Sequence, residues 1–297
     1  MRKMKLSTRQ ATILLAFVIS ARATSFMFSK LCLTSMNAFS LIALRFTTAS
    51  VILFLIFGKK IVRSLHKWNV YSGMMIGAVF YLVLVAEHTG LKTTPASSAA
   101  FIENLAIIIV PFLECMMERT LPTEKALFVA ALAVGGVGIL TMGGENIGFT
   151  SGDVFLLAAA FLYAVGIILT ARRVKNGDSF VIGFFQVTTT GVLAWVHVLL
   201  RGDLTIPKSS SQYIMILILA VVCTSFGFTL QPVAQSKLSP QTAGSFCALG
   251  PLVASACGCI FLNERFTVYS LAGSVLILFA LAMQSDLIHL TPLIIRR

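Results

Sequence analysis

The sequence predicts an all-α membrane protein with ten transmembrane helices, arranged as two inverted five-helix repeats. Three observations lead to this prediction. Apolar residues make up 57% of the 297 residues, charged residues only 11%, and the mean hydropathy is +0.92. The apolar residues gather into long uninterrupted runs, and one sequence motif occurs twice. Soluble domains contain about 25% charged residues, so this composition indicates a chain built for a lipid environment.

The apolar runs are each about 20 residues long, which is the length that a helix needs to cross about 30 Å of hydrocarbon. Transmembrane strands would be shorter and would alternate apolar with polar residues, so helices are expected. In chain order the runs cover residues 11–30, 38–57, 69–88, 96–117, 124–142, 151–171, 180–200, 212–230, 242–262 and 268–288.

The basic residues indicate how these helices are oriented. The formal net charge is +12, and most Lys and Arg residues lie in the connections that fall on the same side as the N-terminus. Lys and Arg concentrate in cytoplasmic loops of membrane proteins, so both termini are expected in the cytoplasm and the chain in the inner membrane. The positive charge therefore reflects topology, and a nucleic-acid partner is not expected. The first run also resembles a secretory signal, but its removal would leave only nine runs, and we expect it to be retained.

The repeated motif divides the chain into two copies. Lys92–Phe101 reads KTTPASSAAF and Lys237–Phe246 reads KLSPQTAGSF, 145 residues later (237 − 92). Such a period predicts two copies of one unit, residues 1–147 and 148–297, joined near the Gly-rich stretch Gly143–Asp153. Five helices per copy would turn the second copy upside down in the membrane. Inverted repeats are typical of transporters that expose a central site to each side in turn.

Several other functions are disfavoured. The chain contains no nucleotide-binding loop and leaves no room for a cytoplasmic ATPase domain, so an ATP-driven pump is not expected. An integral-membrane enzyme is disfavoured because the sequence has no paired acids at motif spacing, no Gly-x-Ser-x-Gly motif and no metal-binding His pair. No catalytic residue, metal ion or cofactor is predicted.

Short motifs in a fixed order suggest a known family. They are Ser29-Lys30, Leu44-Arg45-Phe46, the Pro95 and Pro240 motifs that begin the fourth and ninth runs, Gly250-Pro251, Glu264-Arg265 and Gly273. With the duplication, they resemble the EamA type of the drug/metabolite transporter superfamily over nearly the whole chain. The resemblance implies ten helices and export of amino acids, nucleobases, drugs or other metabolites, by proton antiport or facilitated flux. The sequence departs from the family at Arg22, and at Glu103-Asn104.

Ionisable residues inside the runs are the main candidates for a site, because each costs several kcal/mol unless it faces a cavity or a partner. Arg22, Arg45 and Glu103 are each about seven or eight residues from the outer end of a run, which places them about 10–12 Å deep. Equal depth permits either an Arg22–Glu103 or an Arg45–Glu103 pair. Such a pair would form a site for a charged or zwitterionic solute, with Glu103 as a candidate proton carrier, or would only hold helices together.

Further polar residues in the runs complete the predicted site. The substrate-binding set is Arg22, Arg45, Glu103, Asn104, Tyr163, Gln186 and Gln231. Pro111 and Pro251 indicate either broken helices that line a cavity or simple kinks. Glu87 and His88, at the end of the third run, are expected nearer the outer surface.

The predicted function is a secondary transporter that exports a small metabolite, amino acid-like or drug-like, by alternating access with proton coupling through Glu103. The alternative is a lipid-carrier flippase, and an integral-membrane enzyme is less favoured. The expected partners are a small-molecule solute and the lipid bilayer, with the chain as a monomer or a homodimer.

Overall fold

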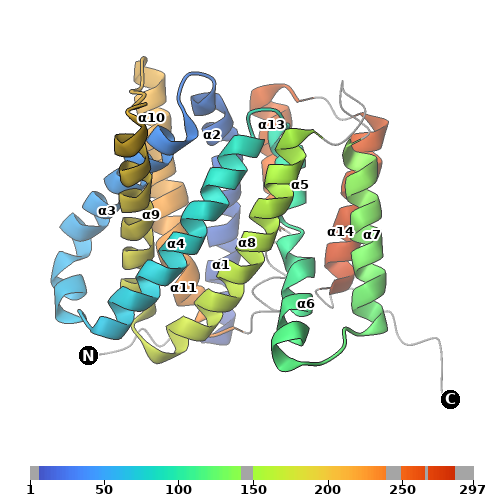
Figure 1. Cartoon of the computed structure of the whole chain (residues 1–297), viewed down its shortest axis with the longest axis horizontal. Helices are drawn as coiled ribbons and strands as arrows, with labels where there is room; N and C mark the ends of the chain where they lie inside the picture. The colour runs from blue at the N-terminus through green and yellow to red at the C-terminus, as the bar shows by residue number, and fades with distance from the viewer. Residues whose placement is uncertain (1–6, 142–149, 239–248, 265–266, 285–297) are drawn as a thin grey trace.

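The computed structural model describes residues 7–141, 150–238, 249–264 and 267–284. Within these ranges the secondary structure consists of helices and their short connections (Figure 1). The α-helices are α1 (Thr8–Ala23), α2 (Ser25–Leu33), α3 (Ala38–Arg63), α4 (Lys67–Gly90), α5 (Ala96–Glu103), α6 (Ala106–Glu118), α7 (Glu124–Thr141), α8 (Ser151–Arg173), α9 (Ser179–Arg201), α10 (Ser210–Ile218), α11 (Thr229–Gln235), α13 (Leu249–Leu262) and α14 (Val268–Gln284). A short 3-10 helix η1 (Val174–Asn176) and a π-helix η2 (Leu219–Phe228) complete the set.

The helices confirm an all-α, multi-pass membrane protein. By length and composition, seven helical segments within the described residues can cross a membrane: Thr8–Leu33, Ala38–Arg63, Lys67–Gly90, Ala96–Glu118, Ser151–Asn176, Ser179–Arg201 and Ser210–Gln235. They coincide with seven of the predicted runs. The other three runs correspond to the shorter described helices α7, α13 and α14, and residues 242–248 of the ninth run lie outside the described residues. Ten crossings and the inversion of the second half stay predictions.

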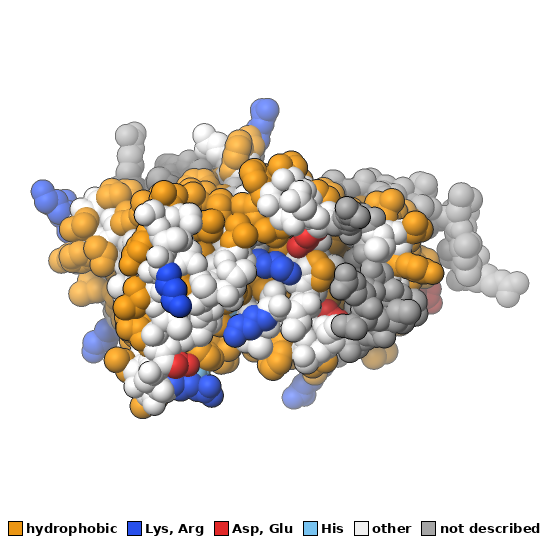
Figure 2. Space-filling model, turned by 90° about the horizontal axis from the view of Figure 1, so that it is seen from above, with side chains coloured by type: hydrophobic (Ala, Val, Ile, Leu, Met, Phe, Trp, Pro, Cys, Tyr) orange, Lys and Arg blue, Asp and Glu red, His pale blue; other side chains and the backbone are white. Residues whose placement is uncertain are grey.

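The outer surface of the bundle is strongly apolar. Large side chains such as Leu55, Leu121 and Leu200 are 78%, 91% and 82% exposed. Figure 2 looks onto the end that is uppermost in Figure 1, and hydrophobic side chains gather around the rim while polar and basic ones lie across the middle. A surface of this kind would be unstable in water and is suited to contact with lipid.

The core of the bundle is built from helices of both halves of the chain. Helix α9 packs along α3 and α4, and α4 also packs along α8. Gly77 lets α4 and α9 approach closely, because a Cβ atom there would lie 2.6 Å from the Gln186 carbonyl oxygen. Gly136 does the same for the pair α7 and α14, where a Cβ atom would lie 2.7 Å from Ile277 Cγ1. Close backbone approach at small residues is the usual basis of helix packing in membranes.

Both halves begin with the same helix-starting device. Ser7 and Gln10 form a reciprocal capping box at the start of α1, and Thr150 and Asp153 form one at the start of α8. In each, a side-chain oxygen accepts from a backbone N–H that would otherwise have no partner. Helix α1 begins and α14 ends at the same, lower end of the bundle in Figure 1.

At the opposite, upper end, a carboxylate from the second half caps a helix of the first half. Glu264 accepts hydrogen bonds from the Ala96 N–H (2.7 Å), the Ser97 N–H (3.1 Å) and the Ser97 hydroxyl (2.6 Å), all in the first turn of α5. Nearby, Lys30 Nζ donates to the Thr94 carbonyl oxygen at 2.6 Å. We call this set of contacts the α5 latch. It joins the Pro95 motif of the first copy to Glu264 of the second.

Candidate functional site

Three of the membrane-crossing segments are irregular in the middle, and the irregular points lie beside the polar residues. The first segment changes from α1 to α2 at Thr24, directly after Arg22 and Ala23. The fourth changes from α5 to α6 at Asn104 and Leu105, directly after Glu103. The seventh, Ser210–Gln235, contains the π-helix η2. Broken or irregular helices are tolerated at membrane depth where they line a cavity.

The break in the fourth segment does not lie at a proline. Pro111 is inside α6, which continues to Glu118, and Pro251 is inside α13. At the break, the Asn104 side-chain amide donates to the Ala100 carbonyl oxygen at 2.7 Å. Asparagine competes for backbone hydrogen bonds in this way, which accounts for the end of α5 at this point.

A small cavity lies between these irregular points. Its volume is about 30 Å³, enough for one or two water molecules but too little for a metabolite. The described residues that line it are Ile19, Arg22, Ala23, Ser25, Phe26, Leu84, Glu87, Glu103, Asn104, Tyr163, Phe228 and Gly250. They come from both halves of the chain. We call this space, together with the Arg45 and His88 side chains beside it, the polar chamber.

Arg22 enters the chamber from the end of α1 and is held by groups of the second half. Its Nη1 donates to the Tyr163 hydroxyl at 3.0 Å and to Gln231 Oε1. Its guanidinium carbon lies 4.1 Å from the centre of the Phe228 ring, in cation–π geometry. Gly227 is required beside it, because a Cβ atom there would lie 2.5 Å from Arg22 Cγ.

Two carboxyl groups face Arg22 from the first half of the chain. Glu87 of α4 and Glu103 of α5 are each 3% exposed, and their side chains hydrogen-bond to each other. Two carboxyl groups can form such a bond only when one of them carries a proton. Glu87 and His88 lie two and three residues before the last residue of α4, Gly90, and both side chains are buried in the bundle, so their depth stays a prediction.

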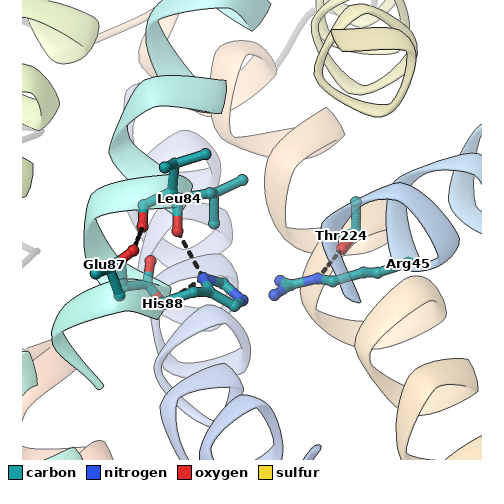
Figure 3. A network of polar contacts seen from close by, with 7 residues as sticks. Arg45, Leu84, Glu87, His88 and Thr224 are labelled. Carbon is teal, nitrogen blue, oxygen red and sulfur yellow. Dashed lines mark hydrogen bonds and ion pairs between the residues drawn. The ribbon is translucent and has the colours of Figure 1, made fainter. Parts of the chain in front are cut away.

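Arg45 lies behind the cavity and is fully buried. Its Nε donates to the Thr224 hydroxyl at 2.6 Å, while neither Nη group has a hydrogen-bond partner within the described part of the chain. Figure 3 shows the guanidinium group aimed at the His88 ring. His88 Nδ1 lies 2.8 Å from the Leu84 carbonyl oxygen, so this nitrogen carries the hydrogen and Nε2 is left as an acceptor. His88 Nδ1 also lies 3.9 Å from Glu87 Oε1.

The structure therefore brings most of the predicted site residues together. Arg22, Glu103, Asn104 and Tyr163 line the cavity, and Gln231 holds Arg22. Arg45 is adjacent but is not one of the residues that line it.

Gln186 is a different case. It is buried on α9 where that helix meets Gly73 and Gly77, and it is not one of the residues that line the cavity. Within the described residues, no group of three His, Cys, Asp or Glu side chains is suited to hold a metal ion.

Sequence reasoning missed Glu87 and His88 as members of the site. The available signal was two adjacent ionisable residues at the end of an apolar run. That signal was interpreted only as a position nearer the outer surface, because the sequence does not show the direction in which a side chain points. The partners in the second half, Thr224 and Phe228, gave no distinguishing signal, since hydroxyl and aromatic residues are common in transmembrane helices.

Comparison with known proteins gives a consistent result. The model of the EamA-like transporter family matches residues 10–142 and again residues 150–285. Two proteins of Archaeoglobus fulgidus, each named an uncharacterized transporter, are 23% and 22% identical to this chain. The first match covers 91% of this chain and 84% of the relative, and the second covers 89% and 93%.

A Bacillus subtilis protein named uncharacterized transporter YcbK is 22% identical over 65% of each chain. One crystal structure aligns with a TM-score of 0.70 and 17% identity, over 95% of this chain and 98% of that chain. At this level of identity the structural match supports the fold alone.

Proposed function

Because the chain belongs to the EamA-like transporter family, we propose that it is a secondary transporter that exports a small charged or zwitterionic metabolite by alternating access. The observation that carries this proposal is the polar chamber. Arg22, Glu87 and Glu103 are ionisable side chains at the breaks or ends of helices deep in an apolar bundle. Residues of this kind are costly in a membrane, and a polar solute that passes through the bundle accounts for them.

The size of the cavity supports a mechanism that involves helix movement. A space of about 30 Å³ cannot hold an amino acid-like or drug-like solute, so helices must separate before such a solute can bind. The breaks at Thr24 and Asn104 provide points at which α2 and α5 can move relative to α1 and α6. Half-helices around a central site are typical of transporters with inverted repeats.

The proposed topology has ten crossings in two inverted copies, residues 1–147 and 148–297, with both termini in the cytoplasm. Its support is that the family model matches twice, and that α1 begins and α14 ends at one end of the bundle. The α5 latch then lies at the outer side and holds it closed. A reporter fused after Arg297 should be active in the cytoplasm, and a signal from the outside would contradict this topology.

Proton coupling is assigned to Glu103. Its carboxyl group shares a hydrogen bond with Glu87 and feels the charge of Arg22, so a solute that changes these contacts also changes how tightly the proton is held. Glu103 is thus placed to exchange a proton at each transport cycle.

The proposal is tested by measuring which metabolites accumulate outside cells that overproduce the protein. We expect one or more small charged solutes to accumulate with the wild-type protein and not with Glu103→Gln. Glu124→Gln is the matched control, because Glu124 is an exposed carboxylate in the first turn of α7 and should leave export unchanged. Equal export by wild-type protein and Glu103→Gln, or no change in any solute, would contradict the proposal.

A further inference from the structure

The chamber carries an excess of positive charge. Arg22 and Arg45 supply two guanidinium groups, while Glu87 and Glu103 share a proton in their hydrogen bond and supply one negative charge between them. His88 is neutral when its Nδ1 hydrogen is given to the Leu84 carbonyl oxygen and its Nε2 is left as an acceptor. One positive charge is therefore left without a counter-charge among these five side chains.

Arg45 is where this imbalance is most costly. It is 0% exposed, it crosses the core from α3, and both Nη groups lack a hydrogen-bond partner among the residues that the structure describes. His88 Nε2 also lacks a hydrogen-bond partner among these residues. Arg45 points toward the His88 ring (Figure 3). Burying a charged group with unused donors costs several kcal/mol, so such a group is retained where a ligand satisfies it.

The surroundings define what kind of ligand fits. Both guanidinium groups lie against the Phe228 ring, at 4.1 Å from its centre for Arg22 and 5.9 Å for Arg45. A single negatively charged group beside this ring can therefore interact with both. The rest of the lining is apolar, with side chains such as Ile19, Phe26 and Leu84. A planar carboxylate matches the donor geometry of guanidinium groups.

We propose that the transported solute is an organic anion, that its carboxylate is bound by Arg22 with Arg45 as the second charge, and that the proton between Glu87 and Glu103 is carried with it. This inference rests on the proposed transport function and names its substrate class. Solute and proton then move in the same direction, and the loaded and empty forms of the chamber carry equal net charge.

The linkage follows from the charges. When the glutamate pair loses its proton, two carboxylates balance two guanidinium groups, and an anion has no remaining attraction. When the pair gains a proton, the excess positive charge returns and the anion binds. Each ligand therefore strengthens the binding of the other, as thermodynamic linkage requires.

Other titratable groups around the pair do not change this balance. From the helices packed around it, the pair faces Arg22, Arg45 and His88, with Tyr163 and the thiols of Cys32 and Cys223 farther out. The thiols and the phenol are neutral between about pH 6 and pH 8. The pair is thus the group in this set that supplies or removes a proton over that range.

The test uses the purified full-length protein in neutral detergent, with acetate as a small carboxylate probe that has a neutral analogue of the same size. Thermal unfolding is measured with acetate, with its neutral analogue acetamide and with methylammonium, at about pH 6 and about pH 8. Sodium benzenesulfonate, a permanently charged anion much larger than acetate, replaces acetate in the control samples so that the ionic strength stays constant. We expect acetate to raise the unfolding midpoint by a few degrees, acetamide and methylammonium to have no such effect, and the rise to be smaller at the higher pH.

Variants identify the groups responsible. Arg45→Gln should abolish the effect of acetate, whereas Arg201→Gln, a change at an exposed arginine, should preserve it. Glu103→Gln mimics the protonated carboxyl group, so acetate should stabilise this variant equally at both pH values.

The inference is overturned if acetate stabilises the wild-type protein no more than acetamide does, a comparison that needs no variant. A pH dependence that persists in Glu103→Gln would overturn its proton part. Export of neutral or cationic solutes, with no response to acetate, would leave the transport function standing and reject the anion. Stabilisation by acetate without export of any solute would support an anion site and reject the transport function.

Discussion

The two halves of the chain meet at the polar chamber but contribute different chemistry. The first half supplies Arg22, Arg45, Glu87, His88 and Glu103. The described part of the second half supplies neutral groups to the same space, namely the Tyr163 and Thr224 hydroxyls, the Gln231 amide and the Phe228 ring.

Where the halves can be aligned, the same contrast appears at a single position. Gln186 of the second half lies 141 residues after Arg45 (186 − 45) and is buried as Arg45 is, but it is neutral and packs against Gly73 and Gly77 of α4. The devices that shape the backbone are, by contrast, common to both halves, as in the capping boxes of α1 and α8. Within the described residues, the two halves share this helix-starting device, while the charged groups of the polar chamber come from the first half.

The comparison between Arg45 and Gln186 gives the largest expected effect. Arg45→Met should reduce export at least about 100-fold, equivalent to about 3 kcal/mol, because it removes a buried charge that the solute needs. Gln186→Met should change export less than about threefold. The two export rates are compared at equal protein levels.

Protein stability separates a functional role of Arg45 from a structural one. Since a methionine buries no unsatisfied charge, Arg45→Met should keep or raise the unfolding midpoint. A loss of stability that matches the loss of export would indicate that Arg45 only holds helices together.

The second prediction concerns the pairing of charges within the first half. Arg22→Ala and Glu103→Ala should each cost about 3 kcal/mol, since each leaves hydrogen-bond partners in the buried cluster unsatisfied and changes its net charge. The double variant should lose less than the sum, by about 1 kcal/mol or more, because the groups interact. Tyr163→Phe, which removes only a neutral partner of Arg22, should cost about 1 kcal/mol. Unfolding of the four variants measures these terms, and additive losses would show that the two charges are not coupled.

The smallest effect is expected where the two halves carry the same residue. Glu264→Ala should cost about 1–2 kcal/mol, because it removes the cap of α5 and three hydrogen bonds. Glu118 is the equivalent carboxylate of the first copy, 146 residues earlier (264 − 118), and is exposed, so Glu118→Ala should change stability by less than about 0.5 kcal/mol. Thermal unfolding of both variants is sufficient, and equal losses would remove the contrast.

The arrangement of helices was largely predictable, because long apolar runs and short polar connections determine where helices can lie in a membrane. That Arg22 and Glu103 can meet at one cavity was predictable from their similar distances to the ends of their runs, since helical rise is constant. The partners across the chamber were not. Sequence position gives depth but not the direction in which a side chain points, so Gln186 was expected in the site and Glu87 was not.

The break between α5 and α6 shows a second limit. Proline is the usual signal for a broken helix, yet Pro111 lies within α6 and the break falls at Asn104. The break depends on a side-chain hydrogen bond to the Ala100 carbonyl oxygen and on close packing with Gly250, whose added Cβ would lie 3.1 Å from the Asn104 side chain. Such tertiary contacts cannot be read from a single chain segment. The α5 latch was missed for the same reason, although the sequence had marked both of its motifs.

Helix α5 has a mechanical consequence of its own. It is eight residues long, which is about 12 Å, and it is tied at its first turn by Glu264 and carries Glu103 at its last residue. A helix this short moves as a rigid lever, so a displacement at one end is delivered to the other. Protonation of Glu103 and release of Glu264 therefore both act on the position of the same helix, α5. If protonation of Glu103 stabilises the closed position of α5, then closure of α5 must strengthen proton binding by the same free energy.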